Sequence, residues 1–188
     1  MELGLTYKKE TQFSKWYKEL IIKCDLIRYY DVGGCYILLP DSYSIWEKVR
    51  ENLDSEFKAR KVKNVYFPIF ITQKNLEKEK NHIEGFSPEV AWVTHSGDTK
   101  LEEKIAIRPT SETAIYNTYS DMIRTYRDLP LKFNQWANVV RWEFKATMPF
   151  IRSREFLWQE GHTCHSSKES ALTEMTQIIN ISKIENYL

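Results

Sequence analysis

The sequence has few cysteines and no long apolar stretch, and both shortages narrow the class of protein. Its 188 residues contain three cysteines, an odd number without a paired CxxC spacing. A disulfide framework is therefore not expected, and a reducing compartment fits better. No apolar run approaches the length of a membrane span, and residues 1–20 are polar and charged rather than a signal segment. We expect a cytoplasmic protein with no membrane partner.

An excess of charge of one sign is also lacking, because 27 Lys and Arg residues balance 26 Asp and Glu residues. This balance gives no global electrostatic sign of a nucleic-acid or membrane partner, although it says little about a small-molecule site. We find no repeat, no low-complexity tract and no strand–Gly-rich loop–helix unit of the dinucleotide or P-loop kind. One compact domain is the simplest organisation.

Apolar periodicity predicts helices near both ends of the chain. One helix is expected from Phe13 to Cys24, and a second begins with Asp41 or Ser42 as its N-cap. The buried face of this second helix is predicted to contain Ile45, Trp46, Val49, Leu53 and Phe57. Further helical patterns cover residues 73–82, residues 109–126 and the tail, where Leu172, Met175, Ile178 and Ile179 recur at helical spacing.

Strand-like segments lie between these helices. Residues 65–71 are apolar on both sides, as in a strand covered on both faces, with Pro68 at an edge, a bulge or an interface. Residues 90–94 and 105–108 are predicted to form an antiparallel pair, and residues 131–144 and 154–163 a hairpin. Helices mixed with antiparallel strands imply an α+β domain.

The predicted hairpin carries the most informative group of charges. Arg141 and Glu143 lie two apart in a strand, so they point to the same face, and Arg152 and Arg154 close the loop. Guanidinium groups held in this way suit a polyphosphate, because arginine is always charged and binds oxyanions in a bidentate manner. The alternative is a ladder of surface salt bridges, and the spacing alone leaves both interpretations open.

A second group is the segment Arg108-Pro-Thr-Ser-Glu112. Thr110 or Ser111 fits a helix N-cap, and Glu112 in the first turn suits the helix dipole. The alternative is that Thr110 and Glu112 converge on the amine of a cationic ligand, which needs a fixed negative partner.

In their order along the chain, these segments resemble the motifs of class II aminoacyl-tRNA synthetases. The helix over residues 44–61 with Val65-Tyr-Phe-Pro68 resembles motif 1, which ends in a proline at the dimer interface. Arg141-Trp-Glu143 with Arg152 resembles motif 2, and residues 108–112 resemble the amino-acid-binding loop of the prolyl, seryl, threonyl and glycyl subclass. Four strings are similar to archaeal/eukaryotic-type prolyl-tRNA synthetases, at residues 84–94, 106–113, 131–136 and 154–162.

The resemblance implies a function and a set of binding residues. The fold would be a class II antiparallel sheet flanked by helices, and the reaction would be activation of proline with ATP and its transfer to tRNA(Pro). Arg141 would hold the α-phosphate and the proline carboxylate, Glu143 the adenine amine and Arg152 the γ-phosphate. Thr110 and Glu112 would bind the secondary amine of proline. The strand that lines the proline pocket would contribute Phe156, Trp158, Glu160 and His162.

The resemblance also implies partners and limits. Pro68 would lie at a homodimer interface, and Mg²⁺ would arrive with the nucleotide. No protein metal site is expected, because His162-x-Cys164-His165 matches no usual zinc spacing. Nothing resembles motif 3 or an anticodon-binding domain, so residues 1–188 correspond to the N-terminal portion of the catalytic domain and are expected to be inactive alone. The alternative is an inactive fragment or paralogue that binds nucleotide, amino acid or a protein partner.

Overall fold

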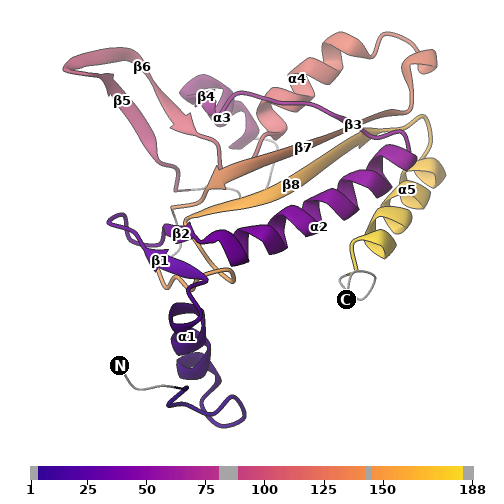
Figure 1. The fold of residues 1–188 in the computed structure, drawn as a ribbon. Helices are drawn as coiled ribbons and strands as arrows, with labels where there is room; N and C mark the ends of the chain where they lie inside the picture. The colour runs from indigo at the N-terminus through magenta and orange to yellow at the C-terminus, as the bar shows by residue number, and fades with distance from the viewer. Residues whose placement is uncertain (1–3, 81–88, 143–144, 184–188) are drawn as a thin grey trace.

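The computed structural model describes residues 4–80, 89–142 and 145–183, and it has the predicted α+β architecture. Two long antiparallel strands, β7 (Leu131–Val140) and β8 (Glu155–Cys164), form the central hairpin. The short strand β3 (Lys63–Asn64) joins the other edge of β7 in parallel. Figure 1 shows this sheet running through the middle of the molecule, with helices on both of its sides.

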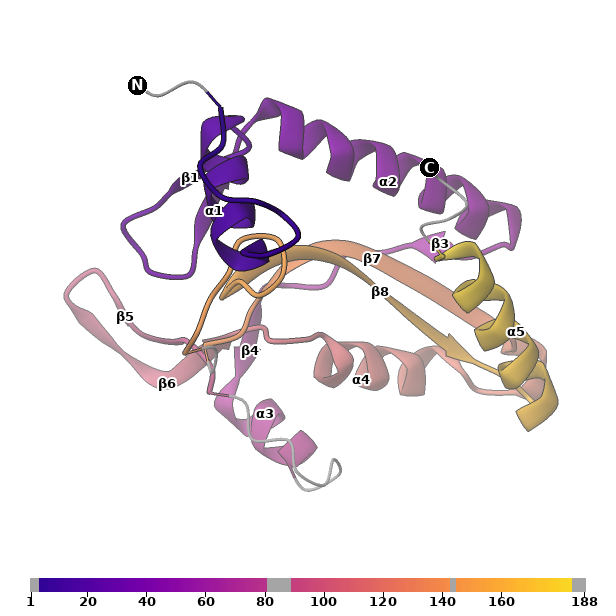
Figure 2. The same ribbon diagram turned by 90° about the horizontal axis from the view of Figure 1, so that it is seen from below.

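The two faces of the hairpin pack against different helices. In Figure 2, α2 (Pro40–Ala59) lies on one side of the hairpin and α4 (Glu112–Met122) on the other. Trp136 of β7 contacts Trp46 and Phe57 of α2. On the same face, Lys132 forms a 2.6 Å ion pair with Glu174 of α5 (Lys168–Ile181). Because side chains alternate along a strand, the odd-numbered residues of β7 face α4.

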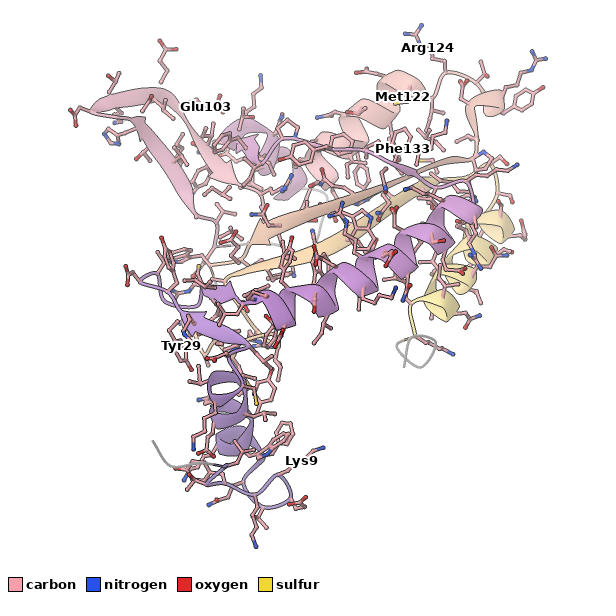
Figure 3. The ribbon with its side chains drawn as sticks, viewed as in Figure 1. Lys9, Tyr29, Glu103, Met122, Arg124 and Phe133 are labelled. Atoms are coloured by element: carbon pink, nitrogen blue, oxygen red, sulfur yellow. The ribbon has the colours of Figure 1, made fainter. Side chains whose placement is uncertain are left out.

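The main apolar core lies between β7 and α4. Phe133, labelled in Figure 3, packs edge-on against Tyr119 of α4, and Phe67 and Ile115 complete the buried cluster. The same face of the hairpin is apolar around Phe133 and carries polar groups where residues 108–111 cross it.

A second sheet and a small N-terminal unit complete the fold. β5 (Trp92–Ser96) and β6 (Thr99–Ile107) form the predicted antiparallel pair, longer than predicted toward the connecting turn and shorter at the other ends. β4 (Phe70–Thr72) pairs with β6 and precedes α3 (Gln73–Lys80). In Figure 1 the β5–β6 hairpin projects away from the central sheet.

The N-terminal unit contains α1 (Phe13–Lys23), β1 (Ile27–Tyr29) and β2 (Tyr36–Leu38). It contacts the loop that joins β7 to β8, because Tyr17 donates a 2.9 Å hydrogen bond to the carbonyl of Pro149. The amide of Arg154 also donates to the carbonyl of Gly34 at 2.8 Å. Gly34 has φ +84°, and a Cβ there would lie 2.9 Å from Arg154 and Thr147, so a larger residue is excluded by both strain and space.

Two predictions about the helix of the motif 1 region are wrong in detail. Helix α2 begins at Pro40 with Leu39 as N-cap, rather than with Asp41 or Ser42 in that role. Proline is well suited to the first helical position, where its missing N–H has no partner to lose. Ser42 instead donates to the carbonyl of Leu26 at 2.6 Å. Ile45, predicted to be buried, is 62% exposed.

The predicted single strand over residues 65–71 is also wrong. Strand β3 ends at Asn64 and β4 starts only at Phe70, and Pro68 lies exposed in the irregular segment between them. The backbone of Phe67 bonds to side chains of Gln135 and Arg108 rather than to a neighbouring strand. Tyr66 is 71% exposed, so the segment is not covered on both faces.

Helix α4 is shorter than the predicted helical range over residues 109–126. It ends at Met122, and a 3₁₀ turn (Tyr126–Asp128) follows. Thr125 and Asp128 cap this turn reciprocally, which gives the chain a separate start after α4. Among the described helices, none combines the length and the apolarity that crossing a bilayer requires.

Candidate functional site

A buried carboxylate lies where residues 108–111 cross the hairpin. Glu160 of β8 is 7% exposed, and its Oε1 accepts hydrogen bonds from the Ser111 hydroxyl at 2.6 Å and from Gln135 Nε2 at 3.0 Å. Its Oε2 accepts from the Ser111 amide at 3.1 Å. The carboxylate is thus fixed by one strand neighbour and by the loop that begins α4.

The sequence left two interpretations of residues 108–112 open, a helix N-cap and a binding site for an amine, and these contacts show how Ser111 is used. Ser111 occupies the N-cap position of α4, but its hydroxyl makes no capping bond and is directed to Glu160 instead. Thr110 donates to the carboxylate of Glu112 and lies 3.4 Å from Glu160 Oε2. The segment therefore brings a second carboxylate, Glu112, to the first one.

His162 completes a group that is suited to a cation. Its Nε2 lies 3.4 Å from Glu160 Oε2, and its ring meets Tyr116 edge-on. Ligand atoms of Glu112, Glu160 and His162 all lie within 4.8 Å of one another. His165, which the sequence suggested weighing with His162, bonds instead to Ser170 and Thr163. Two carboxylates and an imidazole at this spacing can bind a metal ion or an ammonium group.

The electrostatics favour an ionised carboxylate at the centre of this group. Burial by itself would raise the pKa of Glu160, but hydrogen bonds from His162, Ser111 and Gln135 outweigh it, so the pKa lies below the ordinary value of 4.5. The site consequently keeps a fixed negative charge at neutral pH. A cationic ligand that donates hydrogen bonds would complete it.

A cationic group lies further along the same face. The guanidinium of Arg141 lies 5.1 Å above the ring of Trp158 and 5.7 Å from that of Phe156. Its Nε donates to the carbonyl of Pro109 at 3.2 Å, and its amide donates to Arg154 at 2.7 Å, which extends the pairing beyond the end of β7. Stacking and hydrogen bonding together fix the direction of this side chain.

The side chain on which Arg141 stacks and the central carboxylate, Glu160, come from neighbouring positions on one face of β8. Trp158 and Glu160 are two residues apart on β8, and this spacing corresponds to about 7 Å along a strand. Arg141 stacks on Trp158, so the Trp158 ring lies between the guanidinium of Arg141 and the carboxylate of Glu160. This face therefore offers a cation at Arg141 and carboxylates at Glu112 and Glu160, the two kinds of charged partner that a zwitterion needs.

Two residues of the site were not singled out from the sequence. Arg108 opens the predicted binding segment and is 1% exposed, with its guanidinium bonded to carbonyls of Phe67 and Asn138. Gln135 is completely buried beside Glu160. The available signal was a lone amide on the odd-numbered face of β7, between the apolar residues Phe133 and Val139.

The remaining predicted site residues lie elsewhere or outside the description. Arg152 is exposed and lines a cavity of about 930 Å³ with residues of α1 and α2, including Tyr17 and Trp46. Phe156, which lies 5.7 Å from the Arg141 guanidinium, lines the same cavity. The predicted strand over residues 131–144 is too long, because β7 ends at Val140 and Arg141 lies beyond it. The prediction for Glu143 lies outside the described residues. Pro68 is exposed and lies between Phe67 and Ile69, whose carbonyls both accept hydrogen bonds from Arg108.

Comparison with known proteins places these residues in a family context. The family model for the tRNA synthetase class II core domain (G, H, P, S and T) matches residues 92–184. The chain is 56% identical over 179 residues to a putative proline–tRNA ligase of Schizosaccharomyces pombe, covering 95% of this chain and 25% of that protein. It is 58% identical over 188 residues to the cytoplasmic proline–tRNA ligase of Arabidopsis thaliana, covering 99% of this chain and 35% of the relative.

Solved structures give the same result. A prolyl-tRNA synthetase of Cryptosporidium parvum complexed with halofuginone and AMPPNP matches with a TM-score of 0.90 at 58% identity, over 95% of this chain and 37% of that one. The same protein complexed with L-proline and AMP matches with a TM-score of 0.85 at 53% identity, over 95% of this chain and 35% of that one. The chain thus spans between a quarter and a little over a third of these relatives.

Proposed function

Since the chain belongs to the class II aminoacyl-tRNA synthetases and is similar to the prolyl-tRNA synthetases, we propose that it contributes to the site that activates L-proline in a proline–tRNA ligase. The observation that supports this most directly is the pairing of a stacked Arg141 with the Glu112–Glu160–His162 group across Trp158. Such a site matches the two charges of an amino acid. Transfer of the activated proline to tRNA(Pro) completes the proposed reaction.

Each end of proline has a proposed partner. The secondary amine, a cation with two N–H donors, binds Thr110 and Glu112, with Glu160 and His162 behind them. The pyrrolidine ring lies against Phe156 and Trp158. The carboxylate lies at Arg141. A tight apolar pocket separates proline from a smaller amino acid only modestly, since one methylene is worth about 1–3 kcal/mol.

The proposed chemistry needs positioning and charge rather than a covalent nucleophile. One carboxylate oxygen of proline attacks the α-phosphorus of ATP, the bond to the bridging oxygen breaks, and pyrophosphate leaves. Arg141 neutralises the charge that develops on the α-phosphoryl group. Glu143 contacts the adenine amine, and Arg152 binds the γ-phosphate. Arg152 lines the cavity beside α1 and α2 together with Phe156, a residue of the proposed proline pocket.

The nucleotide brings its own cation. Mg²⁺ prefers oxygen ligands in octahedral geometry, which the triphosphate and water supply. The group Glu112–Glu160–His162 fits such an ion poorly, because one ligand is an imidazole and the Glu160 oxygens already accept hydrogen bonds from Ser111 and Gln135. No residue of the chain is therefore assigned to magnesium. The solved relatives complexed with AMPPNP and with AMP support the proposal that a nucleotide takes part.

The remaining proposals concern assembly and location. Residues 1–188 are proposed as the motif 1 and motif 2 portion of the catalytic domain, acting in a cytoplasmic enzyme like the Arabidopsis relative.

A homodimer contact is proposed at Pro68, where Tyr66 and Phe70 are 71% and 53% exposed. Exposed aromatic residues close together on the surface suit a self-complementary interface. Phe70→Asp in the full-length protein should convert a dimer to a monomer in analytical ultracentrifugation, and an unchanged dimer would locate the interface elsewhere.

Amino-acid-dependent ATP–pyrophosphate exchange tests the function in the full-length polypeptide. Exchange is expected with proline, and neither threonine, serine nor glycine should replace it. The matched control is Arg141→Ala, which removes the group proposed to act on the α-phosphate and should abolish exchange. Exchange that depends on another of these amino acids, with none on proline, would overturn the assignment.

A further inference from the structure

We propose that Gln135 is a positioning residue of the amino-acid site, which holds the Glu160 carboxylate in place and ties it to the main chain of Phe67. This inference rests on the proposed function, because it concerns the same pocket. Gln135 is 0% exposed and lies directly opposite Glu160 in the β7–β8 ladder. It does not touch the space that a ligand would occupy, so any effect on substrate must pass through its neighbours.

Every polar atom of the Gln135 amide is used. Its Nε2 donates to Glu160 Oε1 at 3.0 Å and to the Ser111 hydroxyl at 2.9 Å. Its Oε1 accepts from the Phe67 amide. A primary amide offers two N–H donors and one oxygen, and no other side chain of this size presents that combination. The group therefore joins β8, the start of α4 and the segment after β3 at one point.

An apolar residue would suit the packing of this position better than an amide does. Phe133 and Val139, on the same face of β7, are both buried and apolar. A buried amide is tolerated only when its hydrogen bonds are made, and here all three run to groups that build or support the site. The geometry points to a functional reason for the amide, namely fixing the direction of Glu160.

Asn134 provides the matched control. It precedes Gln135 on β7 and is also buried, at 1% exposure, but it lies on the other face and donates to Asn64. Its Oδ1 accepts no hydrogen bond within the described residues. Asn134→Ala therefore removes a buried amide from the same strand without touching Glu160.

The first test compares these variants in the full-length enzyme. Gln135→Met keeps the size of the side chain but removes all three hydrogen bonds. The KM for proline should rise about ten- to a hundredfold, because a bond to a charged group is lost, while the KM for ATP changes less than about twofold. Asn134→Ala should leave both KM values near those of wild type. Equal rises in both KM values, or the same proline effect in Asn134→Ala, would overturn the inference.

Two further measurements separate positioning from a loss of packing. In a Glu160→Gln background, Gln135→Met should raise the KM for proline by less than a further factor of about two, because its effect passes through Glu160. If the two substitutions raised the KM for proline independently, the inference would be overturned. Gln135→Glu places a second carboxyl beside Glu160 and tests the case in which Gln135→Met does not fold. Its KM for proline should be high at neutral pH and fall at lower pH, where the pair holds a proton. A pH-independent KM would contradict positioning.

The wild-type assay keeps this inference distinct from the function on which it rests. A wild-type enzyme without proline-dependent exchange would overturn both. An active wild-type enzyme with an unaltered Gln135→Met variant would overturn this inference alone.

Discussion

Replacing Arg108 by lysine should loosen the junction between the site and the rest of the sheet. Arg108 donates from Nη1 to Phe67 O at 2.7 Å, from Nε to Asn138 O at 2.9 Å and from Nη2 to Asn138 Oδ1 at 3.2 Å. Its guanidinium also lies 5.5 Å from the ring of Tyr66. Lysine offers one nitrogen in place of three, so it cannot serve both sides of this junction.

The size of the effect follows from the bonds that are lost. One lysine nitrogen can satisfy one of the three acceptors, which leaves two oxygens that are at least partly buried without this donor. Each such oxygen costs about 1–3 kcal/mol, so the free energy of local opening should fall by about 2–6 kcal/mol. At about 1.4 kcal/mol per factor of ten, even the lower figure corresponds to about thirtyfold more frequent opening.

Hydrogen–deuterium exchange in the full-length protein can measure this locally. The reporter amides are Val140, which donates to Arg108 O, and Val65, which donates to Asn134 O. Their exchange should be at least about thirtyfold faster in Arg108→Lys. The control is Arg28→Lys, at an exposed residue whose ion pair with Asp25 contributes little. If Arg108→Lys exchanged no faster than this control, the junction would not depend on the guanidinium and the reasoning would fail.

Three further predictions concern the binding groups themselves. Arg141→Lys should lower proline-dependent exchange by about a hundredfold or more, because the stacked bidentate group is lost; activity within tenfold of wild type would contradict its role. Glu112→Ala should raise the KM for proline but not for ATP, and an unchanged proline KM would remove Glu112 from the pocket. The lowered pKa of Glu160 means that its contribution to stability is fully present above its ordinary value of 4.5 and is lost only as pH falls through the lower folded value. Protection of the Ser111 amide, corrected for the intrinsic exchange rate, should therefore persist at pH 4.5, and its loss above that pH would show the pKa to be raised.

Long periodic segments were predictable because their pattern and their environment agree. The apolar stripe that begins at Phe13 gives α1, and the run of Trp, Val and Phe in residues 131–144 gives β7. The pairing of the two strands around Ser96–Thr99 was predictable for the same reason, since turn residues separate two β-rich runs. In each case local preference and tertiary packing favour the same conformation.

The segments that were mispredicted are those in which side chains replace backbone partners. Residues 65–71 look like a buried strand, yet the backbone of Phe67 bonds to the side chains of Gln135 and Arg108. No apolar pattern encodes such a contact, because both partners are remote in sequence. The site was also predictable only in part. Its residue types were identified through the resemblance to a family, whereas the Glu160 network depends on the register of β7 and β8, which the sequence does not specify.

Because side chains alternate along β7 and β8, the residues of the proposed proline site and the residues that hold α2 and α5 lie on opposite faces of the hairpin. Trp158 and Glu160 lie on the face of the proposed proline site, whereas Trp136 and Lys132 hold α2 and α5 on the other. Substitutions at these positions of β8 should therefore leave the contacts to α2 and α5 unchanged. A single family description that spans five amino-acid specificities is consistent with such independent variation. For engineering, a library restricted to the even-numbered positions of β8 should retain folded members at a far higher frequency than one that also varies the even-numbered positions of β7.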